Sequence, residues 1–156
     1  MPMVYSLSLA TAGNLTTNGT PNTETDAFFL KAGVRSAALQ SVMLMGKGAG
    51  LTAISGIIMR IIKFTVASTA GTGITPTPKD PGMQAAKATA ASRPTAGSTR
   101  VNRITFGCGA AGPGGWVAPN VDSMEVLEGG GALSIDGMDA SGTASLVYEL
   151  SAEFQE

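Results

Sequence analysis

Few residues of this chain could carry out chemistry. The chain has 156 residues and no histidine, so it lacks the side chain that most often serves as a general base or a neutral metal ligand. Its one cysteine, Cys108, has no partner for an internal disulfide and no neighbours at a metal-binding spacing. We interpret Cys108 as a small buried or half-buried thiol in a glycine-rich turn.

Two glycine-rich segments resemble nucleotide-binding loops only superficially. Residues 107–112 have the spacing G-x-G-x-x-G after a predicted strand. A dinucleotide site needs a helix to begin there, because the amides of the helix N-terminus hold the pyrophosphate. Pro113 and two further glycines follow instead, and these disfavour a regular helix. The loop at 46–50 contains Lys47 but lacks the residue order of a P-loop. Neither segment predicts a nucleotide site.

The acidic residues offer the best remaining route to catalysis. Asp136 and Asp139 could supply a carboxylate pair for glycoside hydrolysis or ligands for Ca²⁺. They flank a Gly-Met dipeptide, and their spacing is not that of an EF-hand loop. We interpret them as a solvated loop. We therefore predict that the protein is not an enzyme and uses no cofactor and no metal ion.

The basic residues do not predict a nucleic-acid or membrane partner. Arg93, Arg100 and Arg103 come nearest to a cluster, but the net charge is −1 and no RNA-binding motif is present. A protein partner with an acidic surface explains these arginines equally well. No apolar run reaches the roughly 18 residues of a membrane span, since Arg60 and Lys63 interrupt the best candidate.

Charge is strongly segregated along the chain. All ten Lys and Arg lie within 31–103, where Asp80 is the only acid, and residues 104–156 contain no base. The eight acids of that last segment are Asp122, Glu125, Glu128, Asp136, Asp139, Glu149, Glu153 and Glu156. Such a distribution bears on association rather than on fold. With only 13% charged residues, the pattern indicates a folded protein whose surface is partly covered by another protein.

Alternating apolar residues predict an all-β fold. The first strand, 4–11, places Tyr5, Leu7 and Leu9 on one face. Residues 51–66 fit either an amphipathic helix or a strand, and their β-branched residues favour the strand. The other expected strands are 28–30, 38–45, 101–106, 124–127, 132–135 and 144–154, with 128–131 as a hairpin turn and 107–115 as a Gly/Pro turn. About eight short strands indicate a single antiparallel β-sandwich or barrel spanning 1–156.

A long excursion interrupts the strands at 67–99. It is rich in Ala, Thr, Gly, Ser and Pro, and segments of this length are usually functional or disordered. Residues 75–78 are expected to be extended, because residues before proline avoid the α region. Asp80 as a cap and Pro81 at the first helical position favour a short helix over 83–91. We expect the excursion to lie on the surface, less tied to the sandwich than any other part.

The order of these segments resembles a known class of virion protein. The relevant residues are an Ile/Arg/Lys strand running into 64–73, the Thr75-Pro-Thr-Pro-Lys-Asp-Pro81 segment, the Arg100-x-x-Arg103-x-x-Phe106 strand, Trp116 among glycines, and 126–133. In this order they are similar to small virion proteins of tailed bacteriophages, and more broadly to capsid decoration (cement) proteins. The resemblance covers about 58–156 and rests on structural motifs rather than catalytic ones.

The resemblance implies a jelly-roll-like sandwich, a homotrimer, and binding to the major capsid protein on the outside of the virion. Such a protein would stabilise junctions between capsomers. We expect the excursion to contact the shell, and the candidate interface residues are Thr75, Pro76, Pro78, Lys79, Lys87 and Arg93. Two alternatives remain open: another phage structural module, such as a head fibre or tail component, and a jelly-roll carbohydrate-binding module in which Trp116 stacks on sugar.

Overall fold

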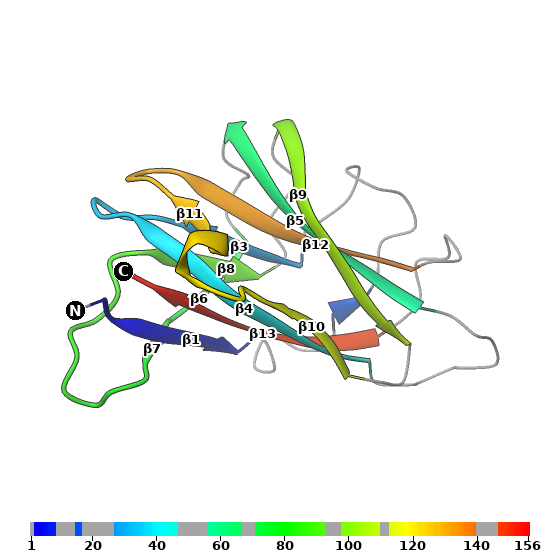
Figure 1. The fold of residues 1–156 in the computed structure, drawn as a ribbon, viewed down its shortest axis with the longest axis horizontal. Coiled ribbons are helices and arrows are strands. Elements are labelled where there is room, and N and C mark those ends of the chain that lie inside the picture. Colours follow the sequence, from blue (N-terminus) through cyan, green and yellow to red (C-terminus); the bar gives the residue numbers. More distant parts are fainter. Residues whose placement is uncertain are drawn as a thin grey trace.

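The protein folds as two antiparallel sheets packed face to face as a β-sandwich (Figure 1). The computed structural model describes residues 2–8, 15–16, 27–46, 56–66, 71–92, 98–109, 113–139 and 147–156. The first sheet, sheet A, contains β1 (Val4–Ser8), β2 (Leu15–Thr16), β4 (Ala37–Gly46), β7 (Thr77–Pro78), β10 (Pro113–Val117), β11 (Glu125–Leu127) and β13 (Val147–Gln155). The second, sheet B, contains β3 (Phe28–Lys31), β5 (Gly56–Val66), β6 (Thr72–Ile74), β8 (Thr89–Ser92), β9 (Ser98–Gly109) and β12 (Ala132–Asp139).

Eight of these strands have the order of a jelly roll. In sheet A the central order is β10-β4-β13-β1, and in sheet B it is β3-β12-β5-β9. Numbered one to eight along the chain, these strands read 6-3-8-1 and 2-7-4-5, which is the double Greek key of a jelly roll. The predicted sandwich is therefore confirmed, including its jelly-roll form. The remaining strands in the described ranges are short additions to this framework.

The predicted strand faces agree with the observed core. Tyr5 and Leu7 of β1 are buried, and the Tyr5 ring stacks on that of Phe154 in β13 with centroids 5.3 Å apart. β5 is a strand, as favoured over a helix, and Ile57, Met59 and Ile61 face the core. The other large side chains between the sheets are Phe28, Leu30, Leu39, Val42, Leu44, Leu133, Ile135, Tyr148 and Leu150.

Three local predictions outside the 67–99 excursion are wrong. Residues 107–109 belong to β9 and 113–115 to β10, so Cys108 lies in a strand and not in a turn. Asp136 and Asp139 likewise lie in β12 and not in a solvated loop. The turn at 128–131 exists, with Gly130 at φ +82° and a Gly131-to-Glu128 backbone hydrogen bond of 2.7 Å. It does not close a hairpin, because β11 pairs with β4 in sheet A whereas β12 pairs with β3 and β5 in sheet B.

The excursion supplies extra edge strands to both sheets. β7 pairs with β1 at one edge of sheet A, and β8 lies between β6 and β3 at one edge of sheet B. The predicted helix over 83–91 is wrong, because turns lead into β8 and that strand pairs with Phe28–Lys31. Most of Thr72–Lys87 is at least partly exposed, as expected, but Ala88, Ala90 and Ser92 are buried. The excursion is thus joined to the sandwich at two edges.

Candidate interaction surface

The candidate interface residues of the excursion gather at one edge of sheet A, beside the chain ends. Thr75, Pro76, Pro78 and Lys79 follow one another through β7, and Thr75, Lys79 and Lys87 are exposed. Arg93 lies outside the described residues. In Figure 1 the 75–88 segment forms the loop at the left, next to the N- and C-terminal labels.

Backbone hydrogen bonds and one carboxylate hold this loop in place. The Lys79 amide donates to the Val4 carbonyl at 3.0 Å. At the other end of the loop, the Glu156 carboxylate accepts hydrogen bonds from the backbone amides of Lys87, at 3.0 Å, and of Ala88. The backbones of Met3 and Glu156 are hydrogen-bonded to each other. Because Val4 follows Met3, the two groups that anchor the loop, the Val4 carbonyl and the Glu156 carboxylate, lie at neighbouring ends of β1 and β13. The loop is therefore held at both ends before any partner binds.

Tyr5 provides a third anchor beneath the loop. Its hydroxyl donates to the Gln84 carbonyl at 3.0 Å. Burial raises the pKa of Tyr5, the nearby Glu156 carboxylate raises it further, and Arg35 opposes the shift. A raised pKa keeps the phenol protonated, which is the state that donates this hydrogen bond.

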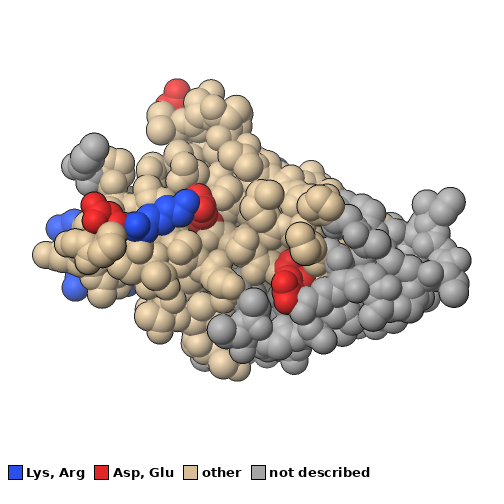
Figure 2. Space-filling view, turned by 90° about the horizontal axis from the view of Figure 1, so that it is seen from below, with Lys and Arg blue, Asp and Glu red and all other residues tan. Residues whose placement is uncertain are grey.

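The outer face of sheet A, next to this loop, is exposed and carries little charge. On β4 the outward-facing Met43 and Met45 are 48% and 55% exposed, and Val117 of β10 is 60% exposed. The register places Met43 between Gly115 of β10 and Ser151 of β13. A Cβ on Gly115 would lie 2.9 Å from the Met43 sulfur, so the absence of a side chain at Gly115 makes room for this thioether. Figure 2 views the molecule from below, where a basic side chain lies against acidic groups at the left and most of the described surface to their right is uncharged.

Two shallow grooves cross this face. One of about 310 Å³ is lined by Met43, Met45, Pro113 and neighbouring residues of β13, with Glu149 as its charged group. The second, of about 400 Å³, lies between the sheet and the loop and is lined by Val4, Gln40, Lys79, Met83 and Glu153, among others. Lys79 forms an ion pair with Glu153 there. The second groove is therefore bordered both by the loop and by the face of sheet A.

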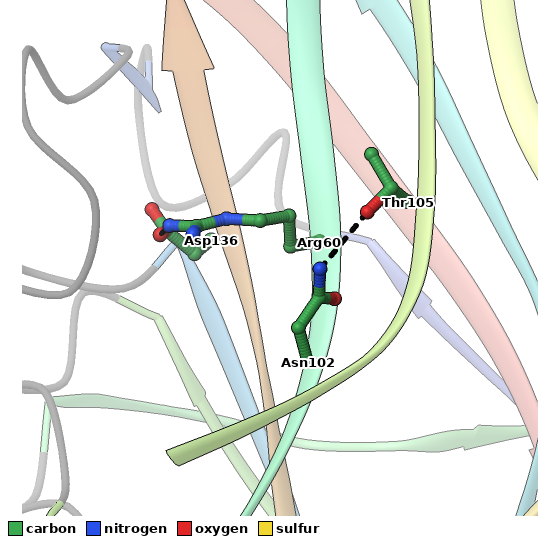
Figure 3. Close-up of polar contacts among 4 residues, drawn as sticks. All are labelled: Arg60, Asn102, Thr105 and Asp136. Carbon is green, nitrogen blue, oxygen red and sulfur yellow. Dashed lines mark hydrogen bonds and ion pairs between the residues drawn. The ribbon is translucent and has the colours of Figure 1, made fainter.

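Several charged side chains elsewhere in the described residues form ion pairs with one another. Arg60 of β5 reaches across the outer face of sheet B to Asp136 of β12, and Asp136 is only 1% exposed (Figure 3). Glu125 of β11 binds Lys63 of β5 at 3.0 Å and Arg103 of β9 at 3.6 Å. Each of these pairs joins a base from 31–103 to an acid from 104–156. The segregation along the sequence is therefore partly neutralised by ion pairs between strands that lie close in space, both within sheet B and between the two sheets, and Lys79 is itself paired.

The described residues bear on two kinds of site that the sequence raised, a metal site and a sugar-binding site. No group of three or more Cys, Asp or Glu side chains in the described ranges could hold a metal ion. Trp116 would stack on the sugar in the carbohydrate-binding alternative, but it is half-buried and packs against the core. No helix in the described part of the chain is long and apolar enough to cross a membrane. Sequence reasoning missed Met43 and Met45, whose alternation within 38–45 could have indicated an exposed face.

No protein family matches the chain, and neither a curated protein nor a solved structure is detectably similar to it.

Proposed function

We propose that this chain is a non-catalytic structural protein of the phage decoration type, which binds the outside of an assembled capsid. The observation that carries the proposal is the continuous, weakly charged surface formed by the outer face of sheet A and the loop beside β7. Within this surface Met43, Met45 and Val117 are about half exposed, and exposed apolar side chains rimmed by polar residues often mark interaction sites. Methionine is enriched in protein interfaces, where lysine and glutamate are depleted. A second protein is the partner chemistry that fits such a face.

The anchored loop suits this role energetically. A loop that must be ordered on binding loses conformational entropy at that moment, which weakens association. Here Val4, Tyr5 and Glu156 already hold the loop. Thr75, Pro76, Pro78 and Lys79 can therefore meet a capsid surface in a preformed arrangement. The same face could in addition support the homotrimer that the resemblance implies, and sedimentation of the purified protein would measure its oligomeric state.

The test is binding to capsid shells. Purified protein is mixed with shells assembled from the major capsid protein encoded in the same phage genome, and the bound fraction is measured after sedimentation. We expect Met43→Glu and Met45→Glu together to reduce binding by at least about tenfold, because carboxylates would be buried in an apolar contact. Lys79→Glu should weaken binding to a smaller extent.

A matched control and a contrary result complete this test. Val34 is 90% exposed and lies between β3 and β4, outside the face, so Val34→Glu should bind like the unaltered protein. Deleting the excursion would be a poor test, since it would remove β7 and much of β8 together with the surface. If all variants bind normally while remaining folded, or if the unaltered protein does not bind at all, the proposal is wrong.

A further inference from the structure

The groove between the outer face of sheet A and the 75–88 loop brings charged and apolar side chains together. Its volume is about 400 Å³, and the described residues that line it are Val4, Gln40, Lys79, Asp80, Met83 and Glu153. Three of them come from β1, β4 and β13, and the other three come from the loop. We call this space the loop groove. It exists because the loop is anchored against the sheet.

The charges that line the loop groove are not balanced. Lys79 of the loop forms an ion pair with Glu153 of β13. Asp80, the next residue of the loop, is exposed, and its carboxylate accepts a hydrogen bond from the Gly82 amide at 3.1 Å. Among the described residues, no base forms an ion pair with Asp80. Two carboxylates and one ammonium group therefore leave an excess of negative charge among the described lining residues.

Gln40 adds a hydrogen-bond acceptor to the same groove. It is the extra residue of a bulge in β4, at the shift in register between Glu153 and Phe154 of β13. Its side-chain carbonyl oxygen is buried and accepts no hydrogen bond from the described residues. A buried acceptor without a donor is unfavourable. A donor that enters the groove beside Gln40 would therefore relieve this cost once the amide rotates towards it.

An arginine side chain fits this combination of groups. Its guanidinium carries a positive charge and several N–H donors that point in different directions, so it can bond to carboxylates and to an amide oxygen at the same time. Its aliphatic stem can pack on Val4 and on the flexible thioether of Met83. An acidic side chain fits less well, because the ammonium group of Lys79 is already paired with Glu153.

We propose that the loop groove receives an arginine side chain of the protein that binds sheet A. This inference rests on the proposed function, because it names the chemical group of the capsid protein that would be recognised at this face. Lys79 has a positioning role, since its ion pair holds the loop against β13 and keeps Glu153 beside the groove. Glutamate in place of Lys79 would set two carboxylates against each other and separate the loop from the sheet, which agrees with the weaker capsid binding expected of that variant.

The first measurement is the binding of Asp80→Asn to capsid shells. Asparagine keeps a side-chain oxygen that can accept the Gly82 amide, so the turn is preserved while the charge is lost. We expect binding to weaken about fivefold. The matched control is Glu128→Gln, which removes the charge of another exposed acid, at the 128–131 turn and outside the groove. It should bind like the unaltered protein.

The second measurement needs no capsid. The isotope-labelled full chain is titrated with the synthetic peptide acetyl-Leu-Arg-Leu-amide, and its backbone amide resonances are followed. We expect saturable shifts of the Lys79, Asp80 and Met83 amides, and Asp80→Asn should reduce the affinity. The same peptide with glutamate in place of arginine should leave these resonances unchanged.

The two measurements distinguish failure of this inference from failure of the proposed function. If shells bind the unaltered protein and Asp80→Asn equally well, or if the arginine peptide shifts these amides no more than the glutamate peptide does, the inference is wrong and the capsid proposal stands. If the arginine peptide binds the groove but the shells bind no protein, the capsid proposal is wrong and the preference of the groove for arginine stands. An oligomeric state that changes in Asp80→Asn would make another copy of this chain the occupant and would overturn the inference.

Discussion

The outer faces of the two sheets occupy equivalent places in the jelly roll but are exposed to different degrees. On the central strand β12 of sheet B, outward-facing Ser134 and Asp136 are 0% and 1% exposed. On the central strand β4 of sheet A, outward-facing Met43 and Met45 are about half exposed. The buried face thus carries an ion pair, and the exposed face carries methionines. Charge on the outer face of sheet B is paired and buried, whereas the weakly charged outer face of sheet A is exposed to solvent.

The largest expected effect comes from breaking the ion pair on the buried face. Asp136→Asn leaves the Arg60 guanidinium largely buried without its carboxylate, and removing one partner of a buried pair typically costs about 3–5 kcal/mol. We expect a loss near the lower limit, about 3 kcal/mol, measured by urea unfolding. Replacing both residues, Arg60→Gln with Asp136→Asn, should recover more than half of the loss, because no charge then remains buried.

Urea unfolding of variants on sheet A tests whether its exposed outer face contributes less to stability than the buried outer face of sheet B. Met43→Ser and Met45→Ser should each change stability by less than about 0.5 kcal/mol, as exposed substitutions usually do. A destabilisation as large as that of Asp136→Asn would show that the methionines serve the core instead.

A smaller effect is expected where β10 meets β4 on the exposed face. A Cβ on Gly115 would lie 2.6 Å from the Val42 carbonyl oxygen, so the strands must shift to accommodate it. Gly115→Ala should therefore cost about 1–2 kcal/mol in thermal unfolding and displace Met43. Gly73→Ala is the control, because its Cβ would have no heavy atom within 4 Å. Equal melting temperatures for the two variants would contradict the close packing of Met43 over Gly115.

Among the variants expected to destabilise the protein, the one with the smallest effect changes the loop at the edge of sheet A. Glu156→Ala removes the acceptor of the Lys87 and Ala88 amides, and we expect a loss of about 1 kcal/mol. Hydrogen exchange of these two amides should become faster, and the pKa of Tyr5 should fall towards its ordinary value because Glu156 contributes to raising it. Glu128→Ala, an exposed acid at the 128–131 turn, should change neither quantity.

The pH dependence of stability follows from the same tyrosine. The pKa of Tyr5 is raised in the folded state, so its contribution is fully present below the ordinary value of about 10 and is lost as pH rises through the folded pKa. Unfolding measurements above pH 10 should show a steeper decline for the unaltered protein than for Tyr5→Phe. Identical profiles would mean that the phenol is not held in its neutral form.

Sequence patterns predicted the strands that carry large apolar side chains and missed those that do not. Tyr5 and Leu7 alternate on β1, and the isoleucines of β5 are β-branched, so both elements were predictable from local residues. β8 consists of Thr, two Ala and Ser, and its strand form depends on pairing with β3. The turn at 128–131 was predictable, but local residues do not specify which sheet the chain enters next.

The candidate surface was predictable only in part, for the same reason. Proline spacing in 75–78 indicated an extended, exposed segment, and this segment lies at the edge of sheet A. The weakly charged face beside it depends on β10, β4, β13 and β1 lying next to one another, and these strands come from distant parts of the chain. Glu156 is 68 positions along the chain from Ala88, whose amide donates a hydrogen bond to its carboxylate. No local pattern could therefore indicate that anchor.

The sequence by itself determined the all-β class, through alternation and β-branched residues, and it excluded histidine chemistry through composition. It also placed bases in one part of the chain and acids in another, so that ion pairs between them had to be long-range. The tertiary structure alone decided which acid meets which base and which outer face stays exposed. Both outcomes depend on strand registers between distant segments, and a shift of one residue in register would move every side chain to the opposite face.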